Sequence, residues 1–592
     1  MISFDGGSNQ LLHDYLKFLP KDKGFLRIQK EGYLADEGMT VCTPSLTAAS
    51  HISTLTGAPP RDHGIVSNNF HILSDPIEKA TNGFSAKLDP KTKTIWEKVR
   101  AQEKKVGVIA YPALDNTDDR RSADWSINFS KQAGASTVQT LTATHFEPYT
   151  STLPASLKSF TPPKVASLIL SDASISDSLT ALPHHHLGPS DKKNKKNIEE
   201  KPPQYTFKVI SIDTSDDKAS NYDTLILDSD DDLANGYVGT ITKTSPWIGI
   251  GFKDAKGTLK GSWCKLVQLT SHLETIKLYT GPIYATQAFP DTFQKTIDEK
   301  LGFWPGPPDK NSLDLGLTEE DLFTQGVRFS EYLKNVTILG AQTQAWDLIL
   351  TYQPLLDELE HMFYMNNPQQ KDFSPEKSKQ YMDIIQRGYL EANKTIDELM
   401  TQFKNSHLVM VSDHGMAPLH HVYYPNRTLE VRGYIDQGSL DNENGKPKYL
   451  AKAFSSGGLS HIYINLTERH KSGIVPKTKY DQLVKEIVNV FKDEEAIAKV
   501  YTKEEAQKLE LDHIHCGDIV LVAKPGYHLS DALDPGQMLE PASFYGQHGY
   551  DSDLPSMKAF HGVWGPKIKP KKVSGVSYKE IVPLVLSLLT DE

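Results

Sequence analysis

Short apolar runs alternate with helix-like segments at both ends of this chain, and this alternation constrains the fold more than any other feature. Near the N-terminus the runs are Met1–Phe4 and Val106–Ala110. After about residue 340 the alternation returns, with the runs Trp346–Thr351 and Leu408–Val411 on either side of the long amphipathic segment Lys377–Phe403. Two further runs follow, His461–Leu466 and Asp518–Ala523. Such alternation is typical of βαβ units and predicts an α/β fold with a mostly parallel central sheet flanked by helices.

The middle of the chain has a different composition. Residues from about 150 to 285 are rich in β-branched and turn residues, which predicts an antiparallel β structure. Residues 286–340 follow as two predicted short helices joined by a Pro/Gly-rich connector. We therefore predict one core formed by residues 1–130 and 341–592, interrupted by a β-rich insertion of residues 131–340.

Charge and composition exclude several classes of function. The net charge of -11 and the pI near 6.0 argue against a long nucleic acid as partner, whereas a small phosphorylated substrate held by metal ions remains compatible. Three cysteines without a CxxC motif exclude a cysteine zinc site.

No run of about 18 apolar residues exists, so no membrane-spanning helix is expected. No secretory signal is visible. The chain starts directly on an apparent core strand, so we expect further residues upstream of it. A targeting segment is one form that these residues could take.

Two side chains that can bind metal directly follow one of the apolar runs. Asp413 and His414 come immediately after the run that ends in Val411 and Ser412. Open α/β sheets place their sites at the carboxyl ends of strands. A carboxylate and an imidazole together suit zinc or a similar divalent ion. The pair therefore predicts part of a metal site.

Three other segments could supply partners, although each has an ordinary alternative. Asp5 ends the first run before two glycines, which also describes a plain turn. Asp357 and His361 share one face of a helical turn, although an exposed acidic helix would show the same spacing. His548 precedes Gly549 in a sequence that could equally form a surface loop.

A further candidate is the hydroxyl of Thr47. It lies near the start of a helix that the residues Pro44 and Ser45 predict. Unpaired N–H groups at a helix N-terminus favour an anion such as phosphate. A hydroxyl there could act as a nucleophile if a metal lowers its pKa, or it could merely cap the helix.

Taken together and in this order, these segments resemble the type I phosphodiesterase/nucleotide pyrophosphatase family of the alkaline phosphatase superfamily. The resemblance covers about residues 1–75 and 345–592, and its most specific parts are Thr47–Gly64, Asp413–Met416 and His548–Asp551. It implies an alkaline-phosphatase-like fold. It also implies a location outside the cytoplasm, either extracellular or periplasmic.

The resemblance assigns roles residue by residue. Two sets of three side chains would each bind one zinc ion: Asp357, His361 and His548 in one set, and Asp5, Asp413 and His414 in the other. Thr47 would be the nucleophile and would also bind the second zinc ion. Other divalent metals are possible in place of zinc. Asn68 and the backbone N–H of Ala48 would bind phosphoryl oxygens, whereas His51 corresponds to no ligand and is expected only to pack. The implied reaction is hydrolysis of a small phosphodiester or pyrophosphate through a phosphoryl-threonine intermediate.

Ala48 departs from the family pattern, in which an aromatic residue at this position stacks on a nucleotide base. A methyl group cannot supply the ~1–3 kcal/mol that stacking on an aromatic contributes, so Ala48 puts nucleotide specificity in doubt unless another segment provides the stacking surface. A phosphonate hydrolase and a phospholipase-C-like or head-group phosphodiesterase are the alternatives within the same chemistry. A phosphomonoesterase is disfavoured because no arginine follows Thr47 to clamp a terminal phosphate. The alternative of another class is a non-catalytic, metal-containing protein that binds a partner through the insertion.

Two polar motifs in the insertion have ordinary interpretations. The run Asp228–Asp232 resembles part of a calcium loop but lacks the required later Gly and Glu, so a solvated turn is expected. The run His184–His186 opens a Lys-rich loop that extends to Pro203, and we expect this loop to be flexible and its histidines to lie at the surface.

Overall fold

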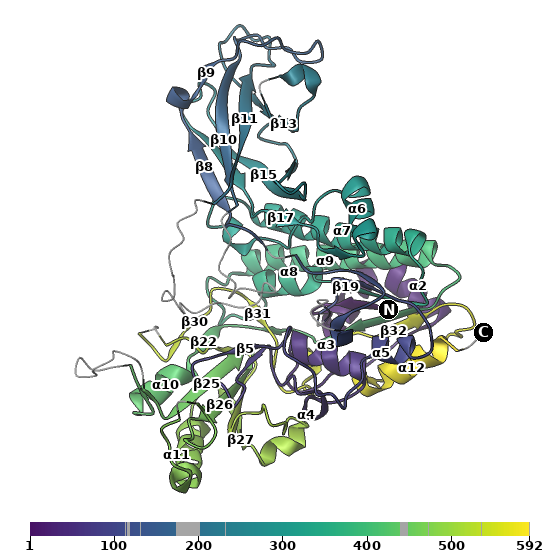
Figure 1. Ribbon diagram of the computed structural model, residues 1–592, viewed down its shortest axis with the longest axis vertical. Helices are drawn as coiled ribbons and strands as arrows, with labels where there is room; N and C mark the ends of the chain where they lie inside the picture. The colour runs from purple at the N-terminus through teal and green to yellow at the C-terminus, as the bar shows by residue number, and fades with distance from the viewer. Residues whose placement is uncertain are drawn as a thin grey trace. The chain divides into compact units, whose positions relative to one another are not determined.

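The computed structural model describes residues 1–112, 114, 119–130, 132–172, 202–230, 232–437, 448–471, 473–533 and 536–590. By its contacts the described part of the chain divides into two compact units (Figure 1). Residues of the first unit fall within Met1–Asn128 and Leu333–Glu592, and residues of the second within Phe129–Pro183 and Lys195–Tyr332. The sequence prediction had placed these limits at residues 130 and 340.

The first unit is built around a sheet whose inner strands are parallel. Its strand order is β7-β6-β19-β1-β20-β32-β2. The pairs from β7 to β20 are parallel, and only β32 runs antiparallel to its neighbours. The strands are β7 (Trp125–Ile127), β6 (Val106–Ile109), β19 (Leu348–Gln353), β1 (Ile2–Phe4), β20 (Leu408–Ser412), β32 (Gly562–Trp564) and β2 (Tyr33–Leu34). The predicted α/β fold with a mostly parallel central sheet is thus confirmed.

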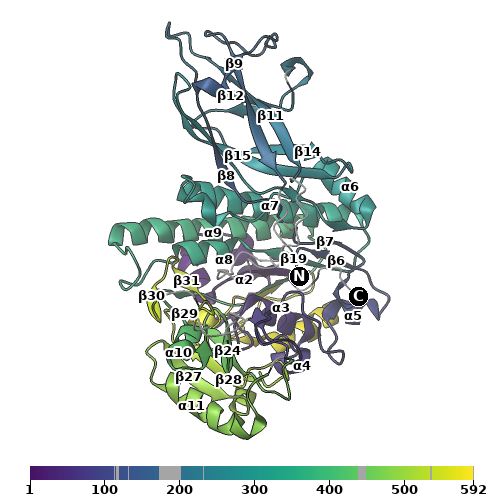
Figure 2. The ribbon, with the colours of Figure 1, turned by 60° about the vertical axis from the view of Figure 1, so that its left-hand side comes forward.

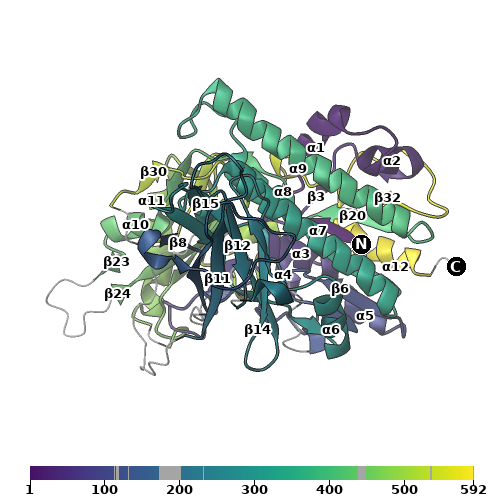
Figure 3. The same cartoon turned by 90° about the horizontal axis from the view of Figure 1, so that it is seen from above.

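Helices cover both faces of this sheet, which explains why its inner strands are mostly apolar. Helices α8 (Leu355–Phe363) and α9 (Pro375–Gln402) lie on one face, and α3 (Thr47–Thr56) and α12 (Ile581–Leu588) lie on the other (Figure 1). Helices α8 and α9 contact each other, and the view from above shows the whole length of α9 (Figure 3). Every residue of β1, β6 and β19 is buried.

The register of the inner strands determines where the following residues lie. Phe4, the last residue of β1, pairs with Gln353 at the end of β19 and with Ser412 at the end of β20. Parallel strands that end in register deliver their next residues to one edge of the sheet. The segments that begin at Asp5 and Asp413 are therefore neighbours in space.

A second, antiparallel sheet in this unit corrects one expectation. Its order is β25-β26-β28-β27, and helix α11 (Tyr480–Lys492) contacts β27 and β28. The runs His461–Leu466 and Asp518–Ala523, which were expected to continue the parallel alternation, form β26 (Leu459–Ile464) and β28 (Ile519–Ala523) of this sheet. The physical reason is the connection before β26, since a turn of two glycines can join only antiparallel strands. The other strands are β25 (Ala451–Ser456) and β27 (Ile497–Thr502).

The second unit contains two antiparallel sheets that share one apolar core (Figure 2). One sheet has the order β13-β12-β11-β10-β9 and the other β14-β15-β16-β8. Their strands are β13 (Gly239–Ile241), β12 (Thr224–Asp228), β11 (Gln204–Ile212), β10 (Lys164–Ser171), β9 (Glu147–Pro148), β14 (Ile248–Lys253), β15 (Leu259–Leu269), β16 (Ile276–Thr280) and β8 (Thr137–Leu141). Leu168 and Phe207 from the first sheet and Cys264 and Leu278 from the second belong to the shared core. The β-rich insertion is therefore present as predicted.

The helices after these sheets differ from the expectation. Helix α6 (Asp291–Lys300) is short, as predicted, but α7 (Glu319–Thr343) has 25 residues. Helix α7 contains no proline, and Thr318 and Asp321 exchange hydrogen bonds at its start. A helix with a formed first turn and no breaker extends until its packing ends.

Two sequence motifs lie outside the described residues, namely His184–His186 and Asp231 of the acidic run. Among the described residues, no helix is long and apolar enough to cross a membrane.

His461 should make the stability of the protein depend on pH. Its Nε2–H donates to the carbonyl of Val66 at 3.2 Å, and its Nδ1 accepts from the N–H of Gly517 at 3.2 Å. Burial, the dominant cause, lowers the pKa of His461 from 6.5 to about 4. Between these values the unfolded chain binds a proton that the folded chain does not, so the stabilisation is complete above pH 6.5 and is lost as the pH falls toward 4.

We expect this loss to be roughly 3 kcal/mol for His461 alone. About 2 kcal/mol of this loss falls between pH 7 and pH 5, so urea unfolding at these two pH values should show a smaller difference for His461→Gln than for the wild type. The exposed His272 provides a control, because His272→Gln should leave the difference unchanged. Equal pH dependence in the wild type and His461→Gln would contradict the assignment.

Candidate active site

Side chains from separate segments converge at the carboxyl edge of the central sheet. They follow β1 and β20, begin α3, occupy the first turns of α8, and follow β31 (Gly546–Gln547). The residues are Asp5, Thr47, Asp357, His361, Asp413, His414 and His548. Each is buried, with at most 4 % of its surface exposed.

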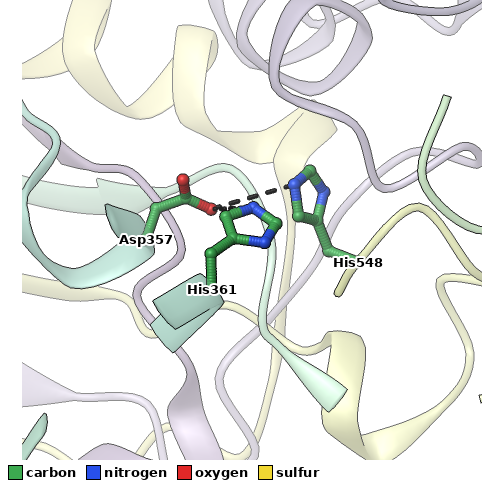
Figure 4. A group of neighbouring side chains, drawn as sticks. All are labelled: Asp357, His361 and His548. Carbon is green, nitrogen blue, oxygen red and sulfur yellow. Dashed lines mark ion pairs between the residues drawn. The ribbon is translucent and has the colours of Figure 1, made fainter. Parts of the chain in front are cut away.

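The side chains that can bind metal form two groups. In each group the ligand atoms lie within 4.8 Å of one another. The members are Asp357, His361 and His548 in the first group (Figure 4) and Asp5, Asp413 and His414 in the second. The structure thus brings together the same two sets of three that the family resemblance implied.

In the first group both imidazoles face one carboxylate oxygen. His361 Nε2 lies 3.4 Å from Asp357 Oδ1, and His548 Nε2 lies 3.8 Å from the same atom (Figure 4). In the second group His414 Nε2 lies 3.3 Å from Asp5 Oδ1 and 3.2 Å from Asp413 Oδ2. His414 Nε2 is also 4.0 Å from Asp357 Oδ1, so the two groups adjoin.

Backbone carbonyl groups orient all three histidines in the same way. The Nδ1–H of each ring donates to a carbonyl oxygen: His361 to Gly546 at 2.7 Å, His548 to Ser45 at 2.9 Å and His414 to Gly415 at 3.0 Å. A ring that donates from Nδ1 presents the lone pair of Nε2, the form that binds a metal. The protein backbone therefore fixes the ligand atom of each histidine.

The main chain also holds the carboxylates in position. The N–H of Gly6 donates to Asp413 Oδ1 at 3.1 Å, and the N–H of Asp357 donates to the carbonyl of Asp5 at 3.1 Å. The hydroxyl of Tyr352 donates to Asp5 Oδ2. Gly6 has a φ of +66°, and a Cβ there would lie 2.7 Å from the Cα of Asp357. Only glycine permits this close approach.

The charges in the site favour a bound cation. Burial, followed by the charges of Asp413 and Asp357, raises the pKa of Asp5 to about 7. Burial alone would lower the pKa of His414, but the charges of Asp413 and Asp5 raise it to about 10. Asp5 Oδ1 and Asp413 Oδ2 are buried and accept no hydrogen bond. Buried carboxylates with imidazoles form the donor set of zinc and similar divalent ions, so the residues fit such a metal.

Thr47 is the first residue of α3 and lies beside the second group. Its Oγ1 is 3.4 Å from His414 Nε2. The residue before the helix, Leu46, provides no side-chain cap. The N–H of Ala48 donates to Asn68 Oδ1 at 2.8 Å, so Asn68 lies at the same helix end. In this structure the Ala48 N–H thus contacts the Asn68 amide, and its expected role in binding a phosphoryl oxygen stays a prediction.

His51 has a larger part in the site than its expected packing role. Its Nδ1 lies 3.3 Å from Asp413 Oδ2 and 2.9 Å from the carbonyl oxygen of Thr47, and its Nε2 lies 3.0 Å from Ser3 Oγ. His51 therefore links helix α3 to a carboxylate of the second group. The spacing of four residues between Thr47 and His51 was the available signal, because it places both on one helix face.

The family model for type I phosphodiesterase/nucleotide pyrophosphatase matches residues 1–215 and 256–551. The chain belongs to this family. Its members are named for the hydrolysis of phosphodiesters and nucleotide pyrophosphates, which agrees with the resemblance found in the sequence. No curated protein matches the chain at a significant level.

The solved structures to which the chain is similar are distant in sequence. Murine ectonucleotide pyrophosphatase/phosphodiesterase 5 is 14% identical, with a TM-score of 0.47, over 99% of this chain and 94% of that chain. The human counterpart gives 14% and 0.47 over 99% and 93%. Phosphonoacetate hydrolase from Sinorhizobium meliloti 1021, in complex with phosphonoformate, is 13% identical with a TM-score of 0.45 over 100% of this chain and 95% of that chain.

Proposed function

We propose that this family member hydrolyses a small phosphodiester or pyrophosphate through a phosphoryl-threonine intermediate on Thr47, with zinc as the expected metal. The observation that carries the proposal is the arrangement of two buried ligand groups beside a hydroxyl at a helix N-terminus. Asp357, His361 and His548 would hold one metal ion, and Asp5, Asp413 and His414 the other. The bound metal ions would supply positive charge for the attacking and departing oxygens.

Thr47 would carry the covalent chemistry. Its Oγ1 gives up its proton and forms a bond to phosphorus while the bond between phosphorus and one ester oxygen breaks. The leaving group takes up one proton as it departs, so the protons balance. Water then cleaves the bond between Oγ1 and phosphorus and restores the hydroxyl. The N-terminus of α3 favours the negative charge of the phosphoryl group throughout.

Asn68 would bind a phosphoryl oxygen through its side-chain NH₂. The Ala48 N–H holds the Oδ1 end of the amide at 2.8 Å, so the Nδ2 end is the one that can donate to a substrate. We assign the Ala48 N–H the role of orienting Asn68. A donor oriented in advance stabilises developing charge without reorganising during the reaction.

The surroundings of Ala48 disfavour a nucleotide as the preferred substrate. Ala48 is fully buried and belongs to an apolar cluster with Ile52 and Phe70. The backbone at Gly83 covers its methyl group, since a Cβ at Gly83 would lie 3.2 Å from the Cβ of Ala48. Gly83 is itself tied to Asn68, because its N–H donates to the Asn68 carbonyl at 2.8 Å. Position 48 therefore provides no surface on which a base could stack.

A comparison of substrates tests this function. Enzyme of measured metal content should hydrolyse bis-p-nitrophenyl phosphate faster than p-nitrophenyl phosphate, and it should not prefer a nucleotide diester to a simple one. A clear preference for the monoester would overturn the proposal. Phosphonate and phospholipid substrates in the same panel separate the alternatives of related chemistry. A protein that holds both metals yet hydrolyses none of these compounds would support the binding-protein alternative.

Asn68→Ala should lower kcat by about 10²-fold, because one donor to the phosphoryl group is lost. KM should change little if Asn68 acts mainly in the transition state. Steady-state kinetics on the preferred diester would measure both. Asn69→Ala is the matched control, since Asn69 is the next residue and its N–H bonds to Ser456. An unchanged kcat for Asn68→Ala would remove Asn68 from the mechanism.

A further inference from the structure

Arg328, in the second unit, is enclosed by two tryptophan rings. It lies on α7, and its guanidinium carbon is 3.9 Å from the ring centre of Trp263 on β15 and 5.1 Å from that of Trp247 just before β14. All three side chains are partly exposed. The indole faces stabilise the positive charge by cation–π attraction.

Two of the three guanidinium nitrogens of Arg328 have no hydrogen-bond partner in the protein. Its Nε and Nη1 atoms are buried and have no hydrogen-bond partner. Among the described residues, no carboxylate lies within ion-pair distance of it, although Lys265 close by pairs with Asp321 at 2.7 Å. The buried Nε1–H of Trp263 also has no acceptor, whereas the Nε1–H of Trp247 donates to Thr324 Oγ1 at 3.0 Å.

The unpaired N–H groups of Arg328 and Trp263 still need hydrogen-bond acceptors. Cation–π contacts act on the faces of a guanidinium, but its five N–H donors lie in its plane. Burial lowers the pKa of Arg328 to about 9, so the group is still charged at neutral pH. Buried, unpaired N–H groups on a charged side chain and on a neighbouring indole call for an acceptor that can reach both, and a charged acceptor is the strongest.

We propose that Arg328 and Trp263 form a binding site for a compact oxyanion, a carboxylate, phosphate or sulfate group. Its oxygens would accept from the unpaired Nε–H or Nη1–H of Arg328 and from the indole N–H of Trp263. The site lies within the second unit and contains none of the residues assigned to hydrolysis. It gives the insertion a ligand-binding role of its own, independent of the proposed hydrolytic function.

Isothermal titration of the metal-loaded, full-length protein with acetate, inorganic phosphate and sulfate tests the site and identifies the preferred anion. Comparison with Arg328→Gln separates this site from anion binding elsewhere. The wild type should show one more binding site than the variant for at least one anion. Equal binding by both proteins, or no binding of any of the three anions to the wild type, would overturn the proposal.

The two tryptophans provide a matched pair that does not remove the charge. Trp263→Phe keeps a ring beside Arg328 but removes the unpaired N–H, so anion affinity should fall about tenfold. Trp247→Phe also keeps a ring, and the N–H that it removes already donates to Thr324 Oγ1. Anion affinity should therefore be nearly unchanged in this variant. This pair decides the question if Arg328→Gln fails to fold. Equal affinities in the two phenylalanine variants would exclude Trp263 as a ligand and overturn the proposed site.

Discussion

Replacing Thr47 with alanine is expected to lower kcat on the preferred diester by about 10⁴-fold or more, because the attacking oxygen is removed. The six proposed metal ligands remain in this variant, so metal content should stay at the wild-type value. Rapid acid quenching of wild-type turnover should trap on Thr47 the phosphoryl group with its remaining ester substituent, detectable by mass spectrometry of the peptide. The alanine variant should show no such peptide.

Thr54→Ala is a matched control for this experiment. Thr54 lies on the same helix, is buried, and its hydroxyl has no hydrogen-bond partner. Its loss should leave kcat within a factor of two or so of the wild type, since a side chain without polar contacts contributes mainly packing. A Thr47→Ala enzyme with full activity would defeat the covalent mechanism, whatever the metal content.

Loss of a metal ligand from either group should abolish activity and lower metal content together. Asp413→Ala removes a carboxylate from one group and His361→Ala removes an imidazole from the other. Loss of a side chain that only hydrogen-bonds to a metal ligand lowers metal affinity about 10–100-fold. Each of these two substitutions removes a direct ligand and should therefore lower metal affinity by more than that. Metal analysis after gel filtration should find about one ion per chain in each variant and two in the wild type.

Metal binding should also stabilise the folded protein. A ligand present at a thousand times its Kd adds about 4 kcal/mol to stability, so chelation should lower the thermal midpoint by several degrees. Asp518→Asn is the control, because it removes a buried carboxylate that belongs to neither ligand group. It disturbs the Asp518–Arg469 ion pair and should lower the stability of the folded protein without changing its metal content. Wild-type metal content in both ligand variants would rule out the assigned sites.

Local sequence patterns predicted the central sheet and the residues at its edge. The inner strands are buried on both faces, so their apolar runs are continuous and end where the ligands begin. Asp5 and Asp413 were identifiable because each directly follows such a run. The convergence of Asp357, His361 and His548 with them required the family resemblance, because no local pattern shows which distant segments meet.

Features that depend on close packing of distant segments were not predictable. The pairing of β26 with β28 depends on tertiary hydrogen bonds between strands far apart in the chain. The burial of Ala48 depends on the backbone at Gly83, and the contact of His51 with Asp413 depends on how α3 lies on the sheet. The sequence shows the residue types in each case, but only the folded chain brings them together.

Gly6 sets the spacing of the two ligand groups by its lack of a side chain. Helix α8, which carries Asp357 and His361, can approach Asp5 this closely only because no Cβ intervenes. The spacing thus depends on one main-chain contact and not on the side chains that surround a substrate. A substitution at a position such as Ala48 leaves this main-chain contact in place, so the distance between the two groups does not depend on it. A side chain at position 6 would instead move α8 and disturb hydrolysis of every substrate at once.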